Sequence, residues 1–159
     1  MGSGSILREV EAAAAILEKD YGVAANIWSL TSINELQREG KAVARWNMLH
    51  PESEPRVPYV SQLLGVDGGP CVVATDYIKS YADQLREFIP GRYTVLGTDG
   101  YGRSDTRAKL RKFFEVSREF VVIAALKSLA DEGSIEMAVV TEAIRALGVS
   151  ADKIDPVTL

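Results

Sequence analysis

The polar residues best suited to chemistry lie together in one loop, between an apolar run and a helical pattern. This candidate loop contains Asp99, Gly100, Tyr101, Arg103, Ser104 and Asp105. A guanidinium beside glycines can make bidentate contacts with a carboxylate, a phosphate or a neighbouring chain, which favours a ligand or interface site. The alternative is a rigid turn in which the glycines supply unusual dihedral angles and Asp105 caps the next helix.

A second, weaker group of candidates is Arg45, Trp46 and His50. Histidine titrates in the range that proton transfer requires, but catalysis also needs a positioned partner, and the surrounding segment offers none. Cys71 opens an apolar run, which is typical of a buried, unreactive thiol.

Several kinds of reactive site are excluded by residue counts and spacing. One cysteine and one histidine cannot form an internal disulfide, a cysteine-based zinc site or a histidine-rich metal site. The glycines after residue 96 depart from the dinucleotide fingerprint, and no nucleophile elbow or phosphate-binding Walker loop is present. We therefore assign no catalytic, cofactor-binding or metal-binding residue.

Residues 2–5, Gly-Ser-Gly-Ser, stand before a helical pattern and are a further candidate for phosphate binding. Such a loop should follow a strand, and only Met1 precedes it here. An engineered leader or a shortened strand-to-helix turn is the favoured interpretation.

The composition predicts one globular domain over residues 1–159. Hydrophobic residues make up 47% of the chain, and the net charge is -4. This charge favours neither nucleic acid nor an anionic membrane as a partner, and no apolar run approaches the roughly 20 residues of a membrane span. A cytoplasmic location is expected.

Hydrophobic spacing predicts strands that alternate with helices. Strands are expected at residues 23–30, 71–75 and 93–96, and helices at 6–21, 33–39, 58–64, 77–89, 105–114, 120–129 and 135–147. Gly40 is expected to end the second helix, and Asp76 to cap the fourth. An irregular, proline-rich segment is expected at residues 45–58, and a tail at 149–159.

This alternation indicates the α/β class, with a mainly parallel sheet between two helical layers. The first helix begins at residue 6 with no apolar run before it, so we expect a first strand to be missing. Loops at the carboxyl ends of such strands commonly hold ligands, which directs attention to the candidate loop.

The segments at residues 45–51, Arg-Trp-Asn-Met-Leu-His-Pro, and 96–105, Leu-Gly-Thr-Asp-Gly-Tyr-Gly-Arg-Ser-Asp, resemble one known family. They are similar to the carboxyl-terminal region of the homodimeric bacterial pyruvate dehydrogenase first components, which are thiamine diphosphate enzymes of transketolase type. The resemblance extends from residues 2–8 to the tail and so covers essentially the whole chain.

The resemblance implies a transketolase C-terminal-like domain with an assembly role, inactive by itself. The longer enzyme would decarboxylate pyruvate and pass the acetyl group to a lipoyl group, with thiamine diphosphate and magnesium held by preceding domains. Implied partners are the other domains of the subunit, the second subunit and the dihydrolipoyl acetyltransferase. The alternative is a small stand-alone α/β module that binds an anionic ligand at the candidate loop.

Overall fold

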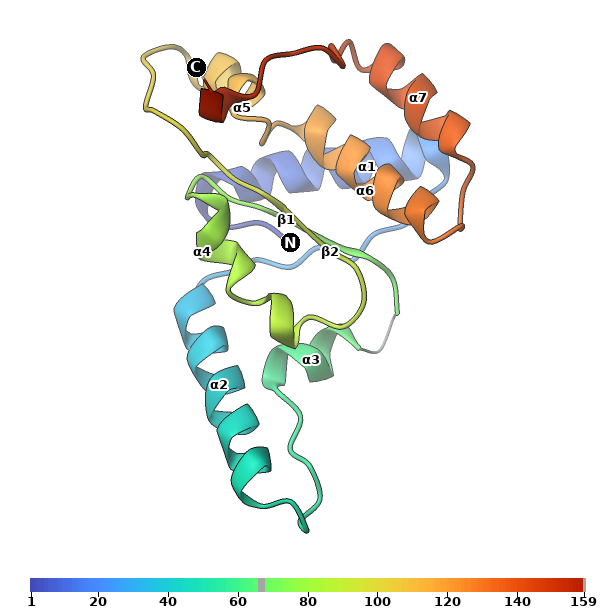
Figure 1. Ribbon diagram of the computed structural model, residues 1–159. Coiled ribbons are helices and arrows are strands. Elements are labelled where there is room, and N and C mark those ends of the chain that lie inside the picture. Colours follow the sequence, from blue (N-terminus) through green and yellow to red (C-terminus); the bar gives the residue numbers. More distant parts are fainter. Residues whose placement is uncertain (66–67, 159) are drawn as a thin grey trace.

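A computed structural model describes residues 1–65 and 68–158 (Figure 1). The strands are β1 (Cys71–Ala74) and β2 (Tyr93–Leu96). The α-helices are α1 (Leu7–Tyr21), α2 (Ile33–Leu49), α3 (Tyr59–Leu64), α4 (Lys79–Asp83), α5 (Arg107–Phe113), α6 (Arg118–Asp131) and α7 (Met137–Ala146). Three short 3-10 turns are η1 (Gly4–Ile6), η2 (Arg86–Phe88) and η3 (Pro156–Thr158).

The two strands form a parallel sheet that is covered on both faces. Cys71 pairs with Tyr93, and Ala74 pairs with Leu96. Alternate side chains point to opposite sides, so Ala74 packs in one core cluster and Val73 in the other. The predicted α/β class, with helices on both sides of a parallel sheet, is confirmed.

Residues 1–3 occupy a strand position beside β1. Gly2 forms parallel bridges with Ala74 on one side and with Ser29 on the other. The Ser3 amide donates to the Ala74 carbonyl at 3.2 Å, and the Leu30 amide donates to the Gly2 carbonyl at 2.8 Å. The strand position that we expected to be missing is thus filled over this short length.

The predicted strand at residues 23–30 is wrong for most of its length. Among these residues only Ser29 forms a bridge, because its neighbour in the sheet is the short segment 1–3. A hollow of about 290 Å3 lies between residues 23–28 and the start of β1. Apolar side chains line much of it, including Met1, Val10, Leu17, Val23, Val72 and Val121.

One face of the sheet is covered by α1, α6 and α7, which share the first core cluster. The fully buried members include Ala13 of α1, Val122 and Leu126 of α6, and Ala143 of α7. The strongly apolar pattern of residues 120–129 correctly predicted a deeply buried helix, because α6 lies between the sheet and α7 (Figure 1).

The opposite face is covered by α2, α3, α4 and η2. Their buried side chains include Ile33, Val60, Ala82 and Phe88, joined by Leu85 from the link between α4 and η2. The short helix predicted before residue 65 is confirmed as α3.

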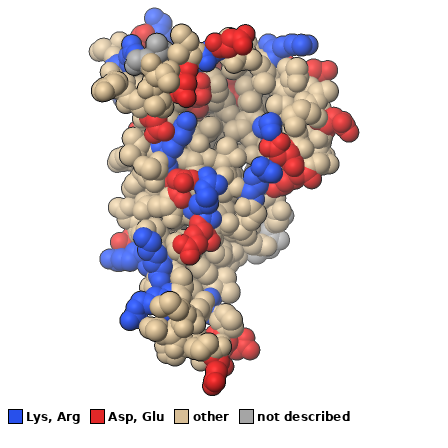
Figure 2. Space-filling model, viewed as in Figure 1, with Lys and Arg blue, Asp and Glu red and all other residues tan. Residues whose placement is uncertain are grey.

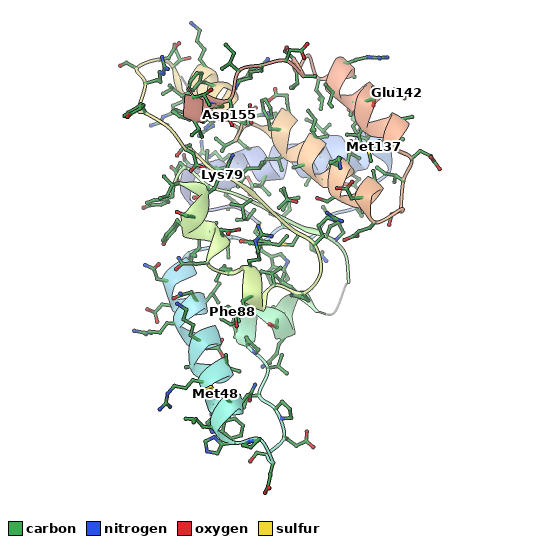
Figure 3. All side chains as sticks on the ribbon, in the orientation of Figure 1. Met48, Lys79, Phe88, Met137, Glu142 and Asp155 are labelled. Atoms are coloured by element: carbon green, nitrogen blue, oxygen red, sulfur yellow. The ribbon has the colours of Figure 1, made fainter. Side chains whose placement is uncertain are left out.

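Two predictions about α2 are wrong. The helix passes through Gly40 and ends at Leu49, so residues 45–49 are helical and the irregular segment is limited to 50–58. Gly40 is needed for packing, because a Cβ atom there would lie 2.6 Å from the Phe88 ring. The α2 end, with Met48, projects away from the sheet (Figure 3).

The helix predicted over residues 77–89 is interrupted. Only α4 and η2 are helical there, and α4 begins after Ile78 rather than at an Asp76 cap. The Tyr77 amide instead donates to the Thr75 hydroxyl at 3.2 Å, which turns the chain before the helix starts.

The C-terminal elements follow the predicted order. α5, α6 and α7 correspond to the last three predicted helices, and Gly148 has the left-handed φ of 64° expected after a helix. In the tail, residues 156–158 form η3, while residue 159 lies outside the described residues. No described helix is both long and apolar enough to cross a membrane.

We expect Gly40→Ala to lower the free energy of unfolding by about 1–3 kcal/mol, because the new methyl group meets the Phe88 ring. The clash should outweigh the roughly 1 kcal/mol that alanine adds to helix propensity. Urea unfolding measures the change. The variant Gly40→Ala/Phe88→Leu should recover part of the loss, and a more stable Gly40→Ala variant would contradict this account.

Candidate functional site

The candidate loop follows the carboxyl end of β2. Just before the loop, Thr98 binds the segment that follows β1. The Thr98 amide donates to the Tyr77 carbonyl at 2.9 Å, and the Thr98 hydroxyl donates to the Asp76 carbonyl at 2.8 Å. Gly97 allows this approach, because a Cβ atom there would lie 2.7 Å from the Tyr77 carbonyl oxygen.

Asp99 and Gly100 have structural roles in this loop. The Asp99 carboxylate accepts a hydrogen bond from the Lys79 amide at 2.8 Å, so it satisfies the first free amide of α4. Gly100 has a φ of 102°, and a Cβ atom there would lie 2.6 Å from the Pro156 carbonyl oxygen. These two residues therefore join the loop to α4 and to the C-terminal segment.

Tyr101 and Ser104 are exposed, and the Tyr101 side chain is 80% accessible. The Asp105 carboxylate accepts from the Thr106 amide at 2.7 Å and lies 3.5 Å from the Lys109 ammonium. The cap of α5 is Thr106, whose hydroxyl accepts from the Lys109 amide, so the expected Asp105 cap is wrong by one residue.

Arg103 is the one strongly basic member of the candidate loop. Its guanidinium carbon lies 5.1 Å from the centre of the Phe113 ring, which holds the group over α5. It also lines a hollow of about 500 Å3 together with Ser5, Asp76, Arg107 and other residues. The structure thus brings the candidate loop together with residues 2–5, which the sequence treated as a separate candidate.

The second candidate group lies on the far end of α2. The Trp46 and His50 rings are stacked with their centres 4.3 Å apart, and the Arg56 guanidinium carbon lies 3.8 Å from the Trp46 ring centre. The His50 Nδ1 atom lies 2.8 Å from the Trp46 carbonyl oxygen. Arg45 is an exposed neighbour on the same helix. These contacts build a surface stack, well separated from the candidate loop (Figure 1).

A buried charge cluster around Glu9 was not among the candidates expected from the sequence. Its side chain is only 7% exposed, and its carboxylate binds Arg111 at 2.8 Å and the Arg118 Nε atom at 3.0 Å. The Arg118 amide also donates to it, at 3.1 Å. A sequence signal existed, because Glu9 lies on the apolar stripe of α1 beside Val10 and Ala13, which predicts a buried carboxylate in need of partners.

The partners of Glu9 decide its ionisation. Burial by itself would raise the pKa of this carboxyl group, but hydrogen bonds from Arg118 and the charges of both arginines outweigh burial and lower the pKa. Glu9 is therefore a stable anion that joins α1 to α5 and α6. Burial raises the pKa of the Cys71 thiol, as expected for an unreactive cysteine.

The described residues, 1–65 and 68–158, contain no group of three or more histidine, cysteine, aspartate or glutamate side chains arranged to hold a metal ion. Acidic and basic side chains are interspersed over the face shown in Figure 2.

The sheet, its two helical layers and the loops at its carboxyl edge define a known class of domain. The chain belongs to the family described as "Transketolase-like TK C-terminal domain", whose family model matches residues 1–117. This confirms the transketolase C-terminal-like fold expected from the sequence.

Individual relatives are similar over nearly the whole chain. A protein named "Pyruvate dehydrogenase E1 component" from Pseudomonas aeruginosa is 55% identical over 98% of the chain. Proteins of the same name from Haemophilus influenzae and Escherichia coli K12 are 54% and 52% identical, again over 98%. The chain spans 18% of the length of each of these relatives. The resemblance drawn from residues 45–51 and 96–105 is therefore confirmed.

We expect Glu9→Gln to lower the free energy of unfolding at pH 7 by about 2 kcal/mol, since charged hydrogen bonds to two arginines are lost. The folded-state pKa of Glu9 is lowered, so its stabilising effect is present above the unfolded pKa of about 4.3 and disappears as the pH falls through the folded value.

Urea unfolding at pH 7 and at lower pH measures this difference between the two proteins. Glu11→Gln is the matched control, because Glu11 is an exposed residue of the same helix. The gap between wild type and Glu9→Gln should narrow in acid. A gap that is the same at every pH would contradict the assigned role of the Glu9 charge.

Proposed function

We propose that this chain is the carboxyl-terminal domain of a pyruvate dehydrogenase first component and that it serves assembly of the enzyme. The observation that carries the proposal is the similarity of 98% of the chain to one region of a protein named "Pyruvate dehydrogenase E1 component". The chain matches a fifth or less of the length of this longer protein. This favours a domain of a larger enzyme over the stand-alone anion-binding module.

The longer enzyme decarboxylates pyruvate and transfers the acetyl group to a lipoyl group in this proposal. Thiamine diphosphate supplies the carbanion chemistry when it is bound, with magnesium, by other domains of the enzyme. The contribution of this chain is structural in this proposal, since the chain matches only 18% of the length of the relative and the cofactor is held by other domains. Its residues shape surfaces that meet the rest of the enzyme.

The projecting end of α2 is the surface that best suits contact with another domain. Four large apolar side chains on the end of α2, on the segment that follows it and at the start of α3 are exposed: Met48 by 70%, Leu49 by 51%, Val57 by 50% and Tyr59 by 54%. Large apolar side chains that remain exposed are common at interaction surfaces. We assign this surface to the other domains of the same subunit or to the second subunit of a homodimer.

The exposed Tyr101 marks a second contact surface on the candidate loop. Aromatic side chains are common in protein interfaces because they combine a large apolar area with a polar end. A cytoplasmic location and contact with the dihydrolipoyl acetyltransferase belong to the same proposal.

A chimaera tests the assembly role. In the Pseudomonas aeruginosa relative, the region that is 55% identical to this chain is replaced by the chain itself. We expect a homodimer by sedimentation and pyruvate-dependent reduction of NAD in the reconstituted complex, because the buried core and surfaces are retained. The isolated chain should turn over no pyruvate.

The controls are the intact relative and the same relative with the region deleted. The deletion is expected to abolish dimer formation. The proposal is wrong if the isolated chain decarboxylates pyruvate, or if the chimaera stays monomeric while circular dichroism shows the chain to be folded.

Docking of the acetyltransferase is tested separately by calorimetry. We expect the isolated linker domain of the acetyltransferase to release heat on mixing with this chain, with the intact relative as positive control. The physical basis is that exposed aromatic groups such as Tyr101 offer a polar end as well as apolar area, and hydrogen bonds formed on binding release heat. If the intact relative gives a clear signal and this chain releases no heat, the proposal that the chain docks the acetyltransferase is wrong.

A further inference from the structure

The chain changes the direction of its crossover connections between residues 1–3 and β1. From residues 1–3 the chain passes through α1 to Ser29 on one side of Gly2, whereas from β1 it passes through α4 to β2 on the other side. α1 packs in the first core cluster and α4 in the second, so the two connections run over opposite faces. Open parallel sheets bind ligands at the carboxyl ends of the strands where such a reversal occurs.

A hollow of about 500 Å3 lies at this point. Its lining comes from the segments that follow these three strand positions: Ser5 after residues 1–3, Asp76 after β1, and Thr98 to Arg103 after β2, with one face of α5 completing it. Small-molecule sites commonly have volumes of about 300–1,000 Å3. The hollow therefore has the size and the place of a ligand site.

The charged groups of the hollow favour an anion. Arg103, Arg107 and Arg111 line it, against the single carboxylate of Asp76. Arg111 is already paired with Glu9 and also donates to the Ser5 carbonyl at 3.3 Å, so it fixes α5 against the start of α1. Within residues 1–65 and 68–158, neither Arg103 nor Arg107 has an ion-pair partner within 4.0 Å.

The unpaired guanidinium of Arg103 is also held in position. It lies over the Phe113 ring, so less rotamer entropy is lost when it binds a ligand. Ser5 and Ile6, which immediately precede the positive end of α1, line the same hollow, and the Ser5 hydroxyl accepts from Arg111 at 3.3 Å, which leaves its proton free to donate. Planar guanidinium groups, a hydroxyl donor and a helix start together match the oxygens of a phosphate group.

We propose that this hollow binds a small molecule through a phosphate or pyrophosphate group, held by Arg103 and Arg107. The concave shape favours a small ligand over an acidic protein surface, which would need a broad contact area. This site does not depend on the assembly function proposed above, since all of its residues belong to this chain.

Calorimetry of the 159-residue chain with sodium pyrophosphate, at constant ionic strength, tests the site. We expect saturable binding, weakened about tenfold or more in Arg103→Ala/Arg107→Ala, because charge-assisted hydrogen bonds are lost. The matched control is Arg38→Ala/Arg145→Ala, which removes the same charge from α2 and α7 and should bind as the wild type does. Succinate, a dianion without phosphate geometry, should bind at least about tenfold more weakly than pyrophosphate.

Circular dichroism establishes that each variant is folded, and Arg107→Lys, which keeps the charge but loses the planar fork, gives a second measurement with an expected intermediate affinity. The proposal is overturned by an absence of saturable heat in the wild type, or by equal loss of affinity in the site and control variants. Succinate binding as tight as that of pyrophosphate overturns the assignment to phosphate.

Discussion

The architecture depends on the backbone pairing of residues 1–3 between Ser29 and β1. These few residues donate and accept hydrogen bonds on both sides, and Gly2 lies so close to α1 that a Cβ atom would be 2.8 Å from the Leu7 Cα atom. Through this contact the first helix is set against one face of the sheet. α1 in turn shares the first core cluster with α6 and α7, while the second cluster lies on the other face of the sheet.

The sequence predicted the fold class and β1, β2, α1 and α6, because their apolar patterns repeat with the period of the element that forms. It was wrong where a distant contact decided the local structure. Gly40 ends helices by intrinsic preference, yet α2 continues because the Phe88 ring packs on it. α4 begins only at Lys79, where its first amide is satisfied by Asp99, twenty residues away. Such long-range partners leave no trace in local periodicity.

For the candidate residues too, the sequence predicted the positions but not the contacts. The sequence correctly placed the candidate loop at a strand end, but it gave no sign that Asp99 serves α4, or that Arg103 lies beside Arg107 and Ser5 around one hollow. His50 was selected for its chemistry, whereas the structure uses it in a stack with Trp46. Residue type therefore identified polar positions, while their roles were set by neighbours distant in the chain.

The Glu9 cluster has a consequence for the order in which the molecule can fold. Arg111 and Arg118 lie 102 and 109 positions beyond Glu9. On a ribosome α1 emerges before α5 and α6, so the Glu9 carboxylate stays in water until Arg111 and Arg118 have been made. Closure of the layer containing α1 and α6 is then a late event, governed by the entropy of a long loop rather than by the helices themselves.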